Sequence, residues 1–479
     1  MEEISSRIVE LSALLVYLIL LLWIGIRSIA QSKTAIDYTL AGRQVRWYVV
    51  LATTAATMVG GGMALGIVGN VFKTGIGYAL ITCGAYFSLM FSGFFLAPKL
   101  RGLNLITVGD YFELRFGILA RSLAVPICIV FLLGCVSAQM VAVGTITNVV
   151  LGIDYRLAVL IGAVVTIFYS TVGGLRAVLK TDVLQFVILV GGFGVAALFL
   201  VTKHGGLSNM VDQAQTGHME LGDWRDLLRI ATIACAFFLG EMLVPPFAAR
   251  CFIAKDPPSA RWGIAGAGLF LLLFLPLTSF VLGTACNISP EVQAAAGDDS
   301  KLALPTLMRT AFHPMFAGVM IAALLAAVMS SADSCLSSLA TIFMEDIFRR
   351  HVRRDATDHQ LLRVAQGTTL FCGIGTAILA LFFRDIIALI EFVYDFWGPT
   401  IVLPFIVGVL WYRESRVFAC VISMFAGLSA MAVWKFGLGT PYAFSPALFG
   451  FAVAVLAFLL ALPITRLWRL GRLVKPQAP

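Results

Sequence analysis

A series of long apolar runs constrains this chain more than any other feature of its sequence. A helix needs roughly 20 apolar residues to cross a bilayer. Of the 479 residues, 60% are hydrophobic and only 13% are charged, whereas soluble domains are about 25% charged. So few charges cannot cover a water-facing surface, which excludes a soluble enzyme. The pattern predicts an all-α integral membrane protein with 13 transmembrane helices, in the runs 8–30, 47–72, 76–98, 122–151, 156–174, 182–202, 228–252, 262–286, 314–346, 361–383, 386–411, 416–436 and 443–468.

The basic residues predict the orientation of these spans. Glu2 and Glu3 precede a first run that is too long for a cleaved signal peptide, so we expect it to remain as an anchor. An odd number of spans places the termini on opposite sides. With the N-terminus outside and the C-terminus cytoplasmic, most of the 34 Lys and Arg residues, Arg250 among them, fall in cytoplasmic loops, as the positive-inside rule requires. The net charge of +8 therefore reflects topology and not a nucleic-acid partner.

The expected location is the cell (inner) membrane, and the expected partners are the lipid bilayer and a small-molecule substrate. The choice between monomer and dimer stays open.

The nine Cys residues are odd in number, form no CxxC pair and lie in or beside apolar runs. They are expected to be small core residues and not a disulfide framework.

The second run contains three consecutive glycines, Gly60, Gly61 and Gly62, at mid-membrane. Each glycine weakens a helix by about 1 kcal/mol, and backbone groups freed in a membrane are tolerated only where they line a cavity or bind something. Close helix packing through small residues is the alternative interpretation. Three glycines exceed what packing needs, so the sequence predicts a broken helix here.

The seventh run has a comparable break, because Gly240–Pro246 places a carboxylate, Glu241, and two prolines in mid-span. With the first run 8–30 set aside as an extra helix, the two broken helices begin two successive five-helix sets. These sets are 47–202 and 228–411, and two further helices follow in 416–468. Interrupted helices at corresponding positions of two halves indicate a single inverted-repeat transporter domain with its site near the midplane.

The ninth run embeds one carboxylate and several hydroxyls in an otherwise apolar helix. Ser330, Asp333 and Ser334 are spaced i, i+3, i+4 and therefore share one helical face. Hydroxyl and carboxylate oxygens are hard donors that suit a small cation. Serine also bonds the i−4 carbonyl in membrane helices, which could explain some of the hydroxyls but not the carboxylate. We therefore predict that this helix coordinates an ion.

Several motifs resemble those of the sodium:solute symporter family, and their sequences are most similar to the choline-transporter branch. The matching segments are Thr57–Gly62, Ser330–Asp346 and Val172–Gln185. Ala248–Arg250 with Ser259–Arg261 match as well. In the third of these segments, the alternative interpretation of Asp182 is a helix N-cap.

The resemblance implies a LeuT-type 5+5 inverted repeat and sodium-driven uptake by alternating access. Sodium would be the coupling ion, and no organic cofactor is expected. The resemblance assigns a principal sodium site to the carbonyls of Ala56, Val59 and Ala327 and the hydroxyls of Ser330 and Ser331. It assigns a second site, present in some members, to Asp182, Asp333 and Ser334.

The solute site departs from the family pattern. The aromatic box of the choline carriers falls on Met58, Ala85, Cys135 and Val244, none of which is aromatic. A carboxylate deep in a membrane needs a counter-charge or a proton. Glu241 or Asp395 could pair with an amine, and the amides of Gly60–Gly62 could receive a carboxylate. The alternative is that Glu241 is protonated and bonds the carbonyls freed near Pro245. The predicted solute is small and amine-bearing, such as an amino acid, with a neutral or anionic metabolite as the alternative. The residues expected to contact it are Met58, Gly60, Gly61, Gly62, Tyr86, Phe237, Glu241, Asp395 and Trp397.

Two other classes are disfavoured. A channel would need a continuous polar pore, whereas the polar groups here concentrate at the midplane. An intramembrane aspartyl protease could use Tyr394–Asp395, but its Gly-x-Gly-Asp partner motif does not occur, and Thr107–Asp110 is the nearest match. A transporter and not an enzyme is therefore expected.

Overall fold

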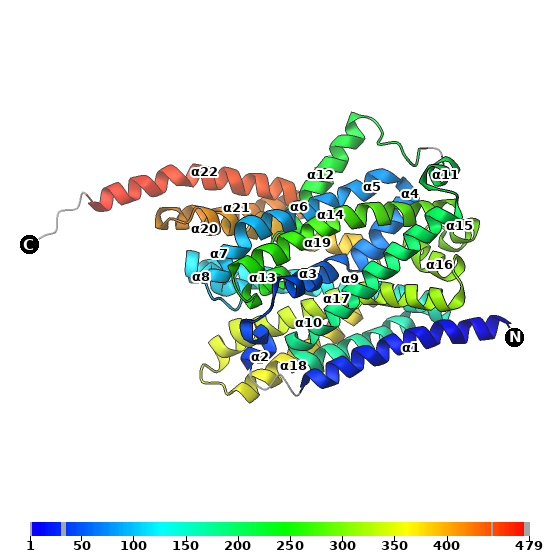
Figure 1. The fold of residues 1–479 in the computed structure, drawn as a ribbon. Helices are drawn as coiled ribbons and strands as arrows, with labels where there is room; N and C mark the ends of the chain where they lie inside the picture. The colour runs from blue at the N-terminus through cyan, green and yellow to red at the C-terminus, as the bar shows by residue number, and fades with distance from the viewer. Residues whose placement is uncertain (1, 30–34, 216, 442–443, 474–479) are drawn as a thin grey trace, which may run out of the picture.

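The computed structural model describes residues 2–29, 35–215, 217–441 and 444–473. Within these residues all regular structure is helical, apart from one isolated β-bridge between Val45 and Ala254. Figure 1 shows long helices packed side by side, with the start of α1 and the end of α22 at opposite ends of the molecule.

The α-helices in chain order are α1 (Glu2–Ile29), α2 (Ala35–Leu40), α3 (Trp47–Val59), α4 (Val68–Thr74), α5 (Ile76–Ile81), α6 (Cys83–Phe91), α7 (Ala97–Gly102), α8 (Val108–Phe116), α9 (Ile118–Leu151), α10 (Tyr155–Lys203), α11 (Leu207–Gln213), α12 (Trp224–Gly240), α13 (Pro245–Ile253), α14 (Pro257–Ile288), α15 (Pro290–Ala296), α16 (Ala303–Thr310), α17 (Pro314–Ile342), α18 (Asp358–Phe382), α19 (Ile386–Trp397), α20 (Leu403–Leu410), α21 (Val417–Ala432) and α22 (Pro446–Leu473). Wider π-helical turns join or extend several of them, at η2 (Gly62–Ile67), η3 (Ser92–Leu96), η5 (Phe343–Val352), η6 (Gly398–Val402) and η8 (Val433–Gly437).

The observed helices are of the type that the sequence predicts. Ten helical stretches of the described chain are long and apolar enough to cross a membrane, or up to twelve if each of two bent pairs is one span. The predicted run 156–174 corresponds to a shorter apolar helix, Tyr155–Thr171, which forms the first part of α10. The all-helical membrane class is confirmed. The count of 13 spans stays a prediction, as do the repeat boundaries.

Both predicted breaks are present. Trp47–Val59 and Gly62–Thr74 meet at an angle of 52°, with the glycine triplet at the junction. Trp224–Gly240 and Pro245–Ile253 meet at 48°, because the prolines begin a new helix at a position where the old one cannot continue. The two bent pairs place four helix ends inside the bundle, where their free backbone groups need partners.

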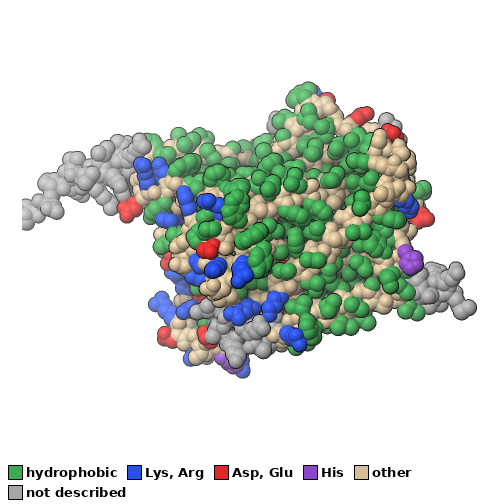
Figure 2. All heavy atoms as spheres, viewed as in Figure 1, with side chains coloured by type: hydrophobic (Ala, Val, Ile, Leu, Met, Phe, Trp, Pro, Cys, Tyr) green, Lys and Arg blue, Asp and Glu red, His purple; other side chains and the backbone are tan. Residues whose placement is uncertain are grey.

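The outer surface is that of a membrane protein. In Figure 2 apolar side chains cover the middle of the visible face, whereas Lys and Arg gather toward the end where α2 and α8 lie. Phe371 and Phe382 of α18 are about three-quarters exposed, at 75% and 76%. Large apolar side chains in such positions are stable where lipid and not water surrounds them.

Candidate sodium and solute sites

The end of α3 meets the middle of α17 in a cluster of oxygen atoms. Ser330 Oγ lies 2.9 Å from the carbonyl oxygens of both Ala56 and Ala327. Ser331 Oγ lies 2.5 Å from the carbonyl oxygen of Thr57 and 3.3 Å from that of Ala327. Four of the five predicted ligands of the principal sodium site are therefore together.

Glycine at position 60 makes this approach possible. Its backbone leaves the helix with φ −2° and ψ −178°, and a Cβ there would lie 2.6 Å from Ser331 Oγ. Val59, the fifth predicted ligand, is the last residue of α3, but its carbonyl takes no part in the hydrogen bonds of this cluster. The carbonyl of Thr57, which the sequence did not single out, occupies the position next to Ser331 instead.

The donor set suits a small hard cation. Carbonyl and hydroxyl oxygens are the ligands that such ions prefer. Both serines are buried, at 0% and 4% exposure. The hydroxyl protons here satisfy the neighbouring carbonyls, and the serine lone pairs remain available to an ion placed among these oxygens.

The three predicted ligands of the second site lie in one buried layer with Arg250. We call this the Arg250 layer. Its members, all fully or nearly fully buried, are Arg250, Asp182, Asp333, Ser334, Thr53 and Thr57. Arg250 Nη2 lies 3.1 Å from Asp182 Oδ2, and it also donates to Ser334 Oγ at 2.5 Å. The interpretation of Arg250 as a cytoplasmic loop charge is therefore wrong, because the side chain turns inward from α13.

Asp333 has a different partner within the same layer. Its Oδ2 accepts the hydroxyl of Tyr169 at 2.8 Å, and it interacts electrostatically with both Asp182 and Arg250. One carboxylate oxygen on each acid, Asp182 Oδ1 and Asp333 Oδ1, has no hydrogen-bond partner in the described chain. Two carboxylates face one guanidinium, so the ionised layer lacks one positive charge. Asp182 caps no helix start, since α10 continues through it.

A central cavity of about 70 Å³ lies beside the principal oxygen cluster. This space is large enough for several water molecules. Of the residues predicted to contact a solute, Met58, Gly60, Gly62, Phe237 and Glu241 line it. The walls also include residues that the prediction missed, among them Phe131, Gln139, Phe247 and Tyr394. Gln139 could have been found as an amide in the middle of an apolar span.

Glu241 is the single acid among the lining residues, and the lining contains no Lys or Arg. It caps the end of α12 and accepts a hydrogen bond from the hydroxyl of Tyr394 on α19. The Tyr394 ring packs against Phe131 and Phe237, with ring centroids 6.1 and 5.6 Å apart. The acid therefore lies in an aromatic, largely apolar chamber.

Four of the residues predicted to contact the solute are not among the cavity lining. Asp395 pairs with Lys435 at 2.6 Å and accepts the amide of Ala447. Trp397 donates its indole N–H to the carbonyl of Met242 at 3.1 Å. Tyr86 is buried against Met63. The amide of Gly61 donates to Gln139 Oε1 at 2.6 Å, so it is not free to receive a solute carboxylate.

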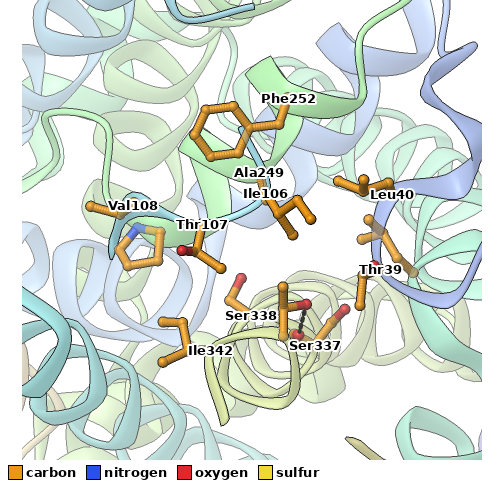
Figure 3. A pocket seen from close by; sticks show the side chains of 13 residues that line it. Thr39, Leu40, Ile106, Thr107, Val108, Ala249, Phe252, Ser337, Ser338 and Ile342 are labelled. Atoms are coloured by element: carbon orange, nitrogen blue, oxygen red, sulfur yellow. Dashed lines mark hydrogen bonds between the residues drawn. The ribbon is translucent and has the colours of Figure 1, made fainter. Parts of the chain in front are cut away.

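A second, smaller pocket lies farther along α17, with a volume of about 20 Å³. In Figure 3 Ser337 and Ser338 of α17 lie along one side of this pocket, and Phe252 of α13 closes the opposite side. Thr107 also lines it, with its hydroxyl donating to Asp346 at 3.0 Å. The Arg250 layer lies between the two pockets, since Ser331 lines the first, Ser334 belongs to the layer and Ser337 lines the second.

Comparisons with known proteins identify the family of the chain. The model of the sodium:solute symporter family matches residues 38–439. The chain is 27% identical to the sodium/glucose cotransporter of Vibrio parahaemolyticus, over 82% of this chain and 78% of the relative. It is 26% identical to the sodium/proline symporter of Salmonella typhimurium, over 88% of this chain and 86% of the relative.

Solved structures give the same fold. A substrate-bound, outward-open Na⁺-coupled sialic acid symporter superposes with a TM-score of 0.81 at 20% identity, covering 95% of this chain and 98% of that one. The nucleobase-cation symporter MHP1 gives 0.56 at 15% identity, covering 91% and 95%. These relatives are transporters and not enzymes, as predicted. The chain belongs to the sodium:solute symporter family.

Proposed function

We propose that this protein imports a small amine-bearing solute together with sodium, and that the solute binds in the central cavity beside Glu241. The observation that carries the proposal is the charge of the cavity. One carboxylate faces the space and no basic side chain does, so the cavity complements a positively charged group. Within a membrane such a carboxylate costs at least about 2.5–3.5 kcal/mol unless something offsets its charge.

The aromatic wall supports the same class of solute. Phe131, Phe237 and Tyr394 surround the acid, and aromatic faces attract ammonium groups by about 0.5–2 kcal/mol. The remaining wall is mostly apolar, which favours a solute with an apolar body. Relatives named as proline symporters carry a solute of this kind.

The family's sodium coupling places the ion, in this proposal, among Ala56, Val59, Ala327, Ser330 and Ser331. An ion held there would join α3 to α17, so its occupancy would favour the conformation in which these two helices are close. We propose a second cation, sodium or a proton, at Asp182, Asp333 and Ser334. The charge deficit of the Arg250 layer and the two unpartnered carboxylate oxygens support it.

Alternating access then involves the Arg250 layer. The layer separates the central cavity from the pocket of Figure 3, whose walls are α13 on one side and α17 on the other. Release of the solute toward that pocket requires Arg250 to move with α13 away from Ser334. The N-terminus is proposed to lie outside the cell membrane, so this pocket is on the cytoplasmic side.

The solute class can be tested with purified protein. Amino acids, organic amines and carboxylates are screened by thermal shift in sodium and in potassium chloride, because a ligand raises the apparent stability of the state it binds. Hits are then followed as uptake into proteoliposomes with an imposed sodium gradient. We expect amines to stabilise the protein only in sodium.

Glu241→Gln should lower amine uptake at least about tenfold, equivalent to about 1.4 kcal/mol, without abolishing sodium binding. Glu391→Gln is the matched control, since Glu391 is an exposed acid on α19 outside the cavity. Sodium-driven uptake of a simple monocarboxylate that is insensitive to Glu241→Gln would contradict the amine assignment.

A further inference from the structure

An apolar groove of about 310 Å³ lies between α1 and three helices of the bundle, and it shares no lining residue with the two pockets described above. Its walls are Leu14 and Leu18 of α1, the last turns of α9 from Val143 to Leu151, Ile161 of α10, and Met329 of α17. Almost no polar atom faces it. A cavity of this size is at the low end of the range for organic ligands.

The groove opens sideways, at the apolar outer surface of α1 and α10. Leu11, Leu15 and Ile161 line it while remaining 37%, 58% and 40% exposed. The outer faces of α1 and α10 beside it carry exposed Val16 and Val164. At this depth the surrounding solvent is hydrocarbon, so the molecule with direct access to the groove is a lipid tail.

Charged groups lie at one end of the groove. Arg309 donates to the carbonyl of Val149 at 3.2 Å and lies 3.7 Å from Glu10. The guanidinium of Arg7 lies 3.7 Å from where a Cβ on Gly152 would stand. Both arginines therefore lie at the last turn of α9, next to Leu151 of the groove. Two guanidinium groups against one carboxylate give this end an excess of positive charge, which complements a phosphate.

The length of the groove matches one leaflet. Arg7 and Leu18 are separated by about 16 Å along α1, at 1.5 Å per residue. Half of a hydrocarbon core of about 30 Å is about 15 Å. A phosphate at the arginines would therefore place a single acyl chain along the full length of the groove, with its end at Met329.

We propose that this groove binds one acyl chain of a membrane phospholipid, whose phosphate pairs with Arg7 and Arg309. The bound chain would join α1 to the bundle. Its inner end would contact Met329, which precedes Ser330 of the principal oxygen cluster. The proposal does not depend on which solute the protein carries.

The test uses the full-length protein in vesicles of phosphatidylethanolamine and phosphatidylglycerol, doped with a phosphatidylglycerol that carries a photoreactive group on one acyl chain. After illumination, the cross-linked peptides are mapped by mass spectrometry. We expect cross-links concentrated on the peptides of α1 and α9 that contain Leu14, Leu18 and Val143. Cross-links spread evenly over the lipid-facing helices, including the exposed Phe371 of α18, would overturn the proposal.

Leu14→Trp fills the groove, whereas Val16→Trp adds the same bulk to an outward position of the same helix that is 57% exposed. We expect the first substitution to lower the cross-linking of α1 and α9 at least about tenfold, and the second to leave it unchanged. Arg7→Gln with Arg309→Gln should weaken the preference for phosphatidylglycerol over phosphatidylethanolamine. Equal labelling of α1 and α9 in all these variants would overturn the assignment of the groove to an acyl chain. If Leu14→Trp does not fold, the cross-linking pattern of the wild type alone tests the assignment.

Discussion

At the scale of single residues, the two acids of the Arg250 layer have different partners and should respond differently to neutralisation. Asp182 pairs directly with Arg250 at 3.1 Å, whereas Asp333 bonds Tyr169 at 2.8 Å. Asp182→Asn removes the ion-pair partner of a fully buried guanidinium, which costs about 3–5 kcal/mol of unfolding free energy. Asp333→Asn keeps the pair between Asp182 and Arg250 and removes the excess negative charge. Its unfolding free energy should therefore fall by less than that of Asp182→Asn.

The same pair of variants tests the second cation. Asp333→Asn should lower the Hill coefficient for sodium binding toward one, while the protein keeps its fold. The measurements are denaturant unfolding and sodium titration of each purified variant. A sodium titration identical to that of the wild type in Asp333→Asn would reject sodium as the second cation.

Glu113 gives a prediction about pH. Hydrogen bonds from Arg350 and Arg121 lower the pKa of Glu113 to about 2, whereas a free glutamate has a pKa of about 4.3. Because the folded value is depressed, the ionised group stabilises the fold above about pH 4.3, and this contribution is lost as the pH falls toward about 2. The ion pair between Glu113 and Arg350 joins α8 to η5.

Glu113→Gln should therefore lower the melting temperature at pH 7 and flatten its dependence on pH between about 4.5 and 2. Glu291→Gln is the control, since Glu291 is an exposed acid of α15 with no ion pair among the described residues. A Glu113→Gln profile that is parallel to the wild type at every pH would show that the pair contributes nothing.

At the scale of helices, the glycine break has a steric purpose that can be tested directly. A Cβ on Gly60 would lie 2.6 Å from Ser331 Oγ, so Gly60→Ala should push α3 and α17 apart. We expect the half-saturating sodium concentration to rise at least about tenfold. Gly191→Ala in α10 is the control, because nothing lies within 4 Å of its Cβ position. Equal sodium affinity in both variants would contradict this account of the break.

The sequence predicted the helices and their breaks because glycine, proline and apolar length act locally. It also placed Ser330, Ser331 and the end of α3 together, through the family motifs. It could not predict which way each helix faces. Asp395 lies mid-span as expected, but the rotation of α19 turns it toward Lys435 of η8 and away from the cavity. Arg250 follows a run of apolar residues, so hydropathy alone assigns it to a loop, although its partners lie on α3, α10 and α17.

At the scale of the whole molecule, the proposed orientation places the charged loop after η5 in the cytoplasm and the loop around Asp298 outside. Asp298 and Asp355 are both exposed. In intact cells carrying Cys235→Ser, which removes the exposed cysteine of the described chain, a membrane-impermeant maleimide should label Asp298→Cys at once. Asp355→Cys should react only after the membrane is opened. The opposite pattern would show that the orientation is inverted.

The central claim is that sodium binds where the broken helix α3 meets α17. The most direct measurement is equilibrium binding of ²²Na⁺ to the purified protein, because it requires no knowledge of the solute. The comparison is between Ser330→Ala, Ser331→Ala and Ser338→Ala, a serine of the same helix whose hydroxyl bonds only the Ser334 carbonyl. The account predicts saturable binding that sodium but not potassium displaces, weakened at least about tenfold in the first two variants and unchanged in Ser338→Ala. Wild-type affinity in both Ser330→Ala and Ser331→Ala would contradict it.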